Sequence, residues 1–222
     1  MFNKTSKWFI LLGIVTLILG ACSGGNSSEV VATVNGEEIL KTDYETELEN
    51  TKNMYTQQGM NLDELDDEMK EQIELSVLNQ LVNTKLVLQT AQEDGVAIEQ
   101  SEVDTELEAI KGQFEDDKGF EETLKKNKIT EDELKVKVKD QLTITKYLDT
   151  TIGKIDVTED EVTVKYDEYK EALASQEQEA EDLETIKPQL EQQIMAEKKS
   201  EKVNELIEEL RTANEKNIEI TL

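Results

Sequence analysis

The stretch Val30-Val31-Ala32-Thr33-Val34-Asn35-Gly36-Glu37-Glu38-Ile39-Leu40 decides how this chain begins to fold. Residues 30–34 are rich in β-branched side chains, which favour strands. Asn35-Gly36 follows at once, and this dipeptide is the strongest short-range signal for a two-residue hairpin turn. We therefore predict a β-hairpin in which residues 37–40 return as a short second arm.

The other end of the chain carries a matching signal. Ile218-Glu219-Ile220-Thr221-Leu222 alternates apolar and polar residues, which predicts a strand. A lone strand would leave backbone groups unpaired along both edges, and the only other strand candidates lie in residues 30–40. We therefore expect residues 218–222 to pair with residues 30–34, so that the ends meet in one lobe from which the middle helices project.

Between the two ends, apolar residues recur at helical spacing. This spacing predicts helices from Thr42 to Gly59, from Asp66 to Asp94 and from Leu183 to Asn214, with a short helix over 120–126. Thr42 with Glu45 and three further hydroxyl–acid pairs have the spacing of a capping box; these are Ser101 with Asp104, Thr130 with Glu133, and Thr158 with Glu161. The predicted fold is mainly α with a small β element.

The first residues have the pattern of a bacterial export signal. Two lysines, Lys4 and Lys7, precede an apolar run over 8–19 that is shorter than the ~20 residues a membrane-spanning helix needs. Leu19-Gly20-Ala21-Cys22 resembles the lipobox of bacterial lipoproteins. We predict that residues 1–21 are a lipoprotein signal peptide and that Cys22 carries the lipid; the alternative is an uncleaved anchor. Residues 22–29 would be a flexible tether on the extracytoplasmic face of the cell membrane.

The charge of the chain excludes several partners. With 24 basic and 51 acidic residues the formal charge is −27, and removal of Lys4 and Lys7 with the signal lowers it to −29. Such a charge repels nucleic acid and anionic membrane surfaces. The sequence has no Walker loop and no dinucleotide-binding glycine motif, so we expect neither a nucleotide nor a cofactor.

Catalytic side chains are also missing. The chain contains no histidine, and its one cysteine is assigned to the lipid, which excludes Ser-His-Asp, Cys-His and most zinc chemistry. Acidic residues crowd positions 63–68, but without the ligand spacing of an EF-hand they are better explained by the positive end of a helix dipole. We expect no catalytic residue, no metal site and no enzymatic activity.

The order of these segments resembles that of the SurA/PrsA chaperones. The resemblance is carried by Ala32-Thr33-Val34-Asn35-Gly36-Glu37-Glu38-Ile39, by Leu78-Asn79-Gln80-Leu81-Val82-Asn83-Thr84-Lys85-Leu86, by the Thr130 and Thr158 segments, and by the last helix and strand. It implies one chaperone domain over 30–222 that shelters unfolded exported proteins. These relatives usually carry a parvulin prolyl-isomerase domain before the last helix. Only a short junction, 171–182, stands there in this chain, so the resemblance implies the chaperone part alone.

The function expected from these features is a lipid-anchored, extracytoplasmic chaperone without a catalytic site. A structural or adaptor lipoprotein with one fixed envelope partner is the alternative, and a prolyl isomerase is a third. Met54, Tyr55, Met60 and Met69 gather at the first connection between helices. Because methionine adapts to many apolar surfaces, these four residues are candidates for client binding, or else they fill the core.

Overall fold

The computed structural model describes residues 29–221 except Lys128 and Gln176. Within this part, three short strands and seven α-helices account for most of the chain. In chain order the elements are β1 (Val30–Val34), β2 (Glu37–Leu40), α1 (Lys41–Gln57), the 3-10 turn η1 (Leu62–Glu64), α2 (Asp67–Glu93), α3 (Gln100–Lys111), α4 (Asp117–Lys126), α5 (Glu131–Ile152), α6 (Glu159–Ala174), α7 (Leu183–Asn214), the 3-10 turn η2 (Glu215–Asn217) and β3 (Ile218–Ile220). The prediction of a mainly α fold with a small β element is confirmed.

The sheet joins the two ends of the chain, as the sequence predicts. Its strand order is β2-β1-β3, and both pairings are antiparallel. Asn35 and Gly36 connect β1 to β2 with positive φ values of 50° and 81°, the conformation that a tight hairpin turn requires. Ala32 lies opposite Ile220 and Val34 opposite Ile218. The N–H of Thr221 donates to the carbonyl of Val31 at 2.9 Å, which extends the pairing by one residue.

The two isoleucines of β3 are not equally buried. Ile218 packs against the core, but 44% of Ile220 is exposed. Both side chains lie on the same face of the sheet, since they are two residues apart in one strand, and Ile220 is the more exposed because it is the last residue of the edge strand β3. The side chain of Leu222 lies outside the described residues.

The main core lies between the sheet and helices α1 and α2. It contains nine buried side chains: Val31, Ala32, Val34, Ile39, Tyr44, Val77, Leu78, Val82 and Leu86. Gln89 on α2 is the polar exception. Its side-chain amide donates to the carbonyl of Val34 at 3.0 Å, and its oxygen accepts from the side chain of Asn35 at 3.0 Å. This clamp fixes the hairpin turn against α2.

Two of the predicted capping boxes form and two do not. Thr130 and Thr158 cap α5 and α6, each paired with the glutamate three residues on. Thr42, however, lies inside α1, because the chain passes directly from β2 into the helix and the N–H of Lys41 is satisfied by the carbonyl of Glu29 at 2.8 Å. Ser101 lies inside α3, because that helix begins one residue earlier and Glu102 accepts from the N–H of Glu99 at 2.9 Å.

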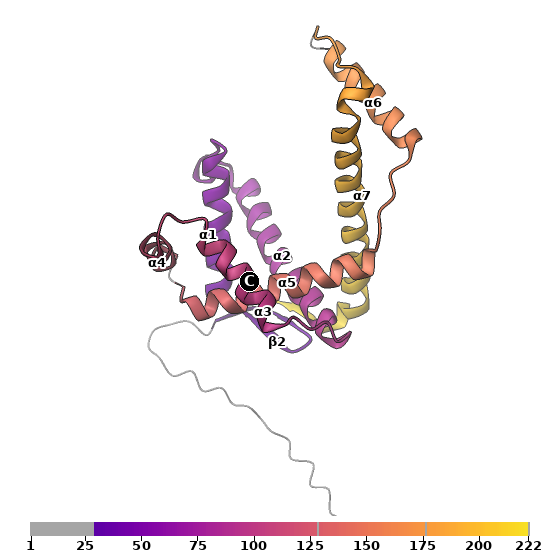
Figure 1. Ribbon diagram of the computed structural model, residues 1–222. Helices are drawn as coiled ribbons and strands as arrows, with labels where there is room; N and C mark the ends of the chain where they lie inside the picture. The colour runs from indigo at the N-terminus through magenta and orange to yellow at the C-terminus, as the bar shows by residue number, and fades with distance from the viewer. Residues whose placement is uncertain (1–28, 128, 176, 222) are drawn as a thin grey trace, which may run out of the picture.

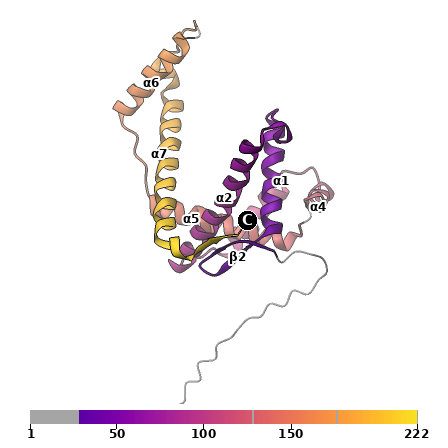
Figure 2. The same ribbon diagram turned by 180° about the vertical axis from the view of Figure 1, so that it is seen from behind.

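Two helical arms rise from the sheet end of the molecule (Figure 1). The α1–α2 hairpin forms one arm, and the α6–α7 hairpin forms the other, on the far side of α5. Figure 2 shows the same arrangement from behind, with β3 at the foot of α7. Helix α5 packs against α2 and α3 and also contacts α7. The α6–α7 arm has its own small core of Val162, Ile186, Leu190 and Ile194.

Candidate functional site

The four candidate client-binding residues lie at the tip of the α1–α2 arm. Met54 and Tyr55 belong to the last turn of α1, Met60 follows in the connection, and Met69 lies in the first turn of α2. The exposed fractions of the three methionines are 51%, 45% and 46%, while Tyr55 is half-buried. The alternative that the methionines fill the core is therefore wrong. The N–H of Met60 donates to the carbonyl of Tyr55 at 2.9 Å, which folds the connection back onto α1.

This group is called the methionine tip below. In the part of the chain that the structure describes, eight large apolar side chains are exposed, and three of them belong to it. Exposed apolar side chains normally occur singly, so a gathering of this kind indicates a contact surface.

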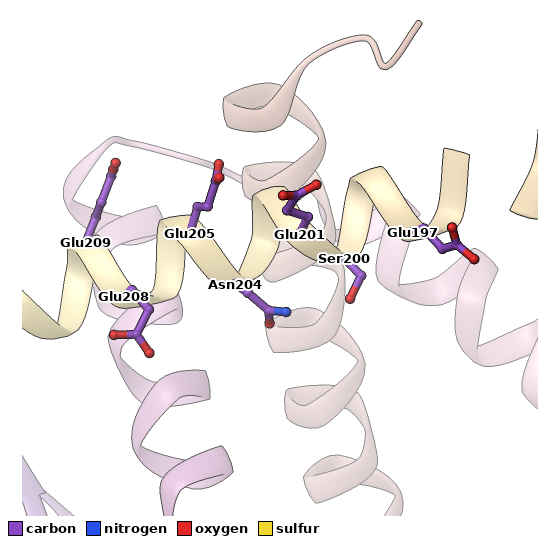
Figure 3. Close-up of a pocket in the computed structure, with 7 residues that line it drawn as sticks. All are labelled: Glu197, Ser200, Glu201, Asn204, Glu205, Glu208 and Glu209. Atoms are coloured by element: carbon purple, nitrogen blue, oxygen red, sulfur yellow. The ribbon is translucent and has the colours of Figure 1, made fainter. Parts of the chain in front are cut away.

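A shallow concave surface lies elsewhere, on one face of α7 (Figure 3). All the residues that line it come from that one helix: Glu197, Ser200, Glu201, Asn204, Glu205, Glu208 and Glu209. The opposite face of α7 is apolar and packs on α2 and α5 through Leu206, Ile207 and Leu210. The acidic face therefore reads as the solvated side of an amphipathic helix, with no apolar side chain that a ligand could cover.

The root of the α6–α7 arm contains Arg211, the only arginine of the chain, whose contacts with α2 the sequence did not predict. Arg211 donates to the side-chain oxygens of Asn83 at 2.7 Å and Asn79 at 3.1 Å, both on α2. Asn79 and Asn83 are four residues apart and so lie on one face of α2. That spacing, together with the single arginine, was the available signal for a contact between these helices.

Ion pairs join α6 to α7 along the arm. The ammonium of Lys198 contacts Glu161 at 2.6 Å, that of Lys187 contacts Glu159 at 2.6 Å, and that of Lys165 contacts Glu197 at 2.8 Å. The hydrogen bond from Lys198, together with those from the backbone and hydroxyl of Thr158, lowers the pKa of Glu161 from 4.5 to about 2. The carboxylate that caps α6 therefore also ties it to α7.

A groove of about 370 Å³ lies between α6 and α7 near their connection. Tyr169, Ile186 and Leu190 supply apolar surface, and Gln189 and Gln193 supply amides. The connection itself comprises residues 175–182, because residues 171–174 of the predicted junction form the last turn of α6. The hydroxyl of Tyr166 donates to the carbonyl of Glu181 at 2.9 Å and holds this connection against the arm.

Other kinds of site are not visible in the described residues. Residues 29–221, apart from the two gaps, contain no group of three acidic, histidine or cysteine side chains able to hold a metal ion. Across the same residues, each helix is too short or too polar to cross a bilayer. Cys22 and the predicted signal peptide, residues 1–21, lie outside the described part of the chain.

The fold and the surface together define a class of protein: a two-armed helical body, closed by a sheet from both chain ends, with an exposed apolar tip. Comparison with known proteins gives the family. Residues 2–148 match the family described as SurA-like N-terminal domain, about two thirds of the chain. The chain therefore belongs to the SurA/PrsA-like family, a family of chaperones and foldases.

The curated relatives carry the name foldase protein PrsA. The proteins from Clostridium botulinum strains Langeland and Kyoto are each 30% identical over 154 residues, and the one from strain 657 is 29% identical over the same length. Each alignment covers 62% of this chain and 46% of the relative. The chain thus spans about half the length of the relatives it matches.

Proposed function

We propose that this protein is a lipid-anchored chaperone on the extracytoplasmic face of the cell membrane, which holds unfolded exported proteins and catalyses no reaction. The exposure of the methionine tip carries this proposal. Three flexible, polarizable side chains lie outside the core at the end of a projecting arm, where they are free to adapt to different partners. Membership of a chaperone and foldase family supports the same function.

The chemistry of the sequence supports the non-catalytic part of the proposal. Histidine is absent from all 222 residues, and the connection between α6 and α7 consists of only residues 175–182. An isomerase domain of the parvulin kind does not fit into such a connection. The lipid anchor at Cys22 is proposed from the lipobox resemblance.

The proposal requires that apolar contact at the tip, rather than at other exposed apolar side chains, protects a client. The test uses the soluble form, residues 23–222, in a light-scattering assay of an unfolded secreted protein. The unmodified form should delay aggregation without nucleotide. The combined substitution Met54→Gln, Met60→Gln and Met69→Gln should abolish most of the delay, since glutamine keeps the length and helix propensity of methionine but not its apolar surface.

Met195 provides a matched control on the other arm, because 46% of this α7 side chain is exposed. Met195→Gln should leave the delay unchanged. No protection by the unmodified form at tenfold excess over several clients would refute the chaperone proposal. It would favour an adaptor, which should instead co-purify with one partner in fixed stoichiometry.

A further inference from the structure

The methionine tip combines apolar exposure with an excess of negative charge. From Met54 to Leu75 the sequence holds seven acidic residues and one lysine, Lys70, for a net charge of −6. The acids are Asp63, Glu64, Asp66, Asp67, Glu68, Glu71 and Glu74. Apart from Asp63, whose side chain is not described, none of them forms an ion pair with another described residue.

Helix formation explains only some of these acids. Asp66 caps α2 by accepting from the N–H of Met69 at 2.8 Å, and Asp67 and Glu68 lie in the first turn, where they interact favourably with the helix dipole. Glu71 and Glu74 lie beyond that turn, and Glu64 precedes the helix. The local charge is therefore larger than the start of α2 requires.

The exposed apolar side chains and the negative charge together determine which segments the tip can bind. A segment that covers the methionines brings its flanking residues close to carboxylates that have no cation of their own. Acidic flanks are repelled there, and lysine or arginine flanks are attracted, so the tip discriminates by charge as well as by apolar contact.

We propose that the methionine tip selects client segments in which a short apolar stretch is flanked by lysine or arginine, and rejects the same stretch flanked by acidic residues. This inference rests on the proposed chaperone function and names the class of its clients. The acidic face of α7 shows why both features are needed. It also carries a cluster of glutamates but no exposed apolar side chain among the residues that line it, so it attracts cations without holding a client.

The experiment uses the full chain in nanodiscs of zwitterionic lipid, with empty nanodiscs as the blank. Three fluorescent peptides share one apolar core and differ only in flanks of two lysines, two serines or two glutamates. At low salt the lysine peptide should bind about tenfold tighter than the serine peptide, and the glutamate peptide about tenfold weaker, as expected for a few exposed charge pairs. The differences should shrink to about threefold or less near 0.5 M salt.

A tip variant and a matched control separate local from overall charge. The tip variant carries Asp67→Asn, Glu68→Gln and Glu71→Gln, and leaves the capping residue Asp66 in place. The control carries Glu201→Gln, Glu205→Gln and Glu208→Gln on α7, where these three side chains form no ion pair with described residues and the change in net charge is the same. The tip variant should lose the preference for lysine flanks while binding the serine peptide as before. The control should keep the preference.

Each outcome decides one of the two proposals. Equal binding of the lysine and serine peptides at low salt would overturn the selectivity but not the chaperone function. Equal loss of the lysine preference in both variants would assign the preference to the overall charge and overturn the role of the tip. A tip variant that keeps the lysine preference would also overturn the role of the tip. Failure of all three peptides to bind, together with no delay of aggregation, would refute the chaperone proposal itself.

Discussion

Strand β3 should contribute unequally to stability along its length, and two single substitutions test this. Ile218 packs against the core of the sheet and α2, whereas 44% of Ile220 is exposed. Replacing a fully buried isoleucine by alanine costs roughly 2–5 kcal/mol, so the half-buried Ile218 should lose about half of that, on the order of 1–2 kcal/mol. Ile220→Ala should cost less, about 1 kcal/mol or below, because nearly half of Ile220 is already in solvent.

Deletion of residues 216–222 should cost more, because it also removes backbone pairing. The N–H of Asn35 loses the carbonyl of Asn217 at 2.9 Å, the carbonyl of Val31 loses the N–H of Thr221, and the β1–β3 ladder disappears. Several hydrogen bonds at about 0.5–1.5 kcal/mol each, added to the loss of Ile218, give roughly 3–6 kcal/mol.

The assay is unfolding in urea, monitored by far-UV circular dichroism. The midpoints of the three variants are compared, provided that the unfolding free energy depends on urea concentration with the same slope in each. A total stability of about 5–15 kcal/mol is typical of a domain, so the deletion should lower the midpoint severely and Ile220→Ala should lower it least. An Ile220→Ala variant as unstable as Ile218→Ala would refute the burial argument. An unchanged midpoint after the deletion would refute the contribution of the pairing.

Three further predictions concern the anchor, catalysis and pH. Cys22→Ala should release the protein from membranes or leave it as an uncleaved precursor, and cell fractionation with mass measurement of the product checks this; normal processing and retention would contradict the anchor. Purified protein should not accelerate cis–trans exchange of a short proline peptide above background, as an exchange assay by NMR would show, and activity that survives purification would oppose the non-catalytic proposal. The pKa of Glu161 is lowered from 4.5 to about 2, so its interaction with Lys198 stabilises the fold above pH 4.5 and is lost as the pH falls toward 2. Thermal melting across this range should therefore show a steeper acid loss for the unmodified protein than for Lys198→Met, and parallel curves would contradict the assignment.

The fold was predictable where local signals and tertiary packing agree. Asn35-Gly36 placed the hairpin, and alternation in the last residues placed β3, because an unpaired strand has few alternatives in a mainly helical chain. The caps at Thr42 and Ser101 failed because a threonine or serine near a helix start is only one way to satisfy the first amides. At α1 the neighbouring carbonyl of Glu29 takes that role, and no local pattern reveals it.

The sequence predicted which residues form the candidate site but not that they are exposed. The sequence grouped the methionines at one connection, but whether a methionine lies in a core or on a surface depends on which helices pack beside it. Met69 continues the α2 stripe of Ile73 and Val77 at a spacing of four residues, yet 46% of it is exposed, because it lies in the first turn of the helix, beyond the buried part of the stripe. Long-range contacts such as Arg211 with Asn83 join residues 128 positions apart, and one sequence alone gives no register for them.

Under the proposed export of this chain, the pairing of β3 with β1 has a consequence for the order of folding events. A chain that crosses the membrane amino terminus first presents Val34 on the far side long before Ile218 arrives, some 180 residues later. During that interval one edge of β1 has no partner, and an open edge invites pairing with other chains. Pairs so distant in sequence also form slowly. This protein should therefore complete its own sheet only after translocation ends. Until then β1 has an unpaired edge, like a strand in an unfolded client.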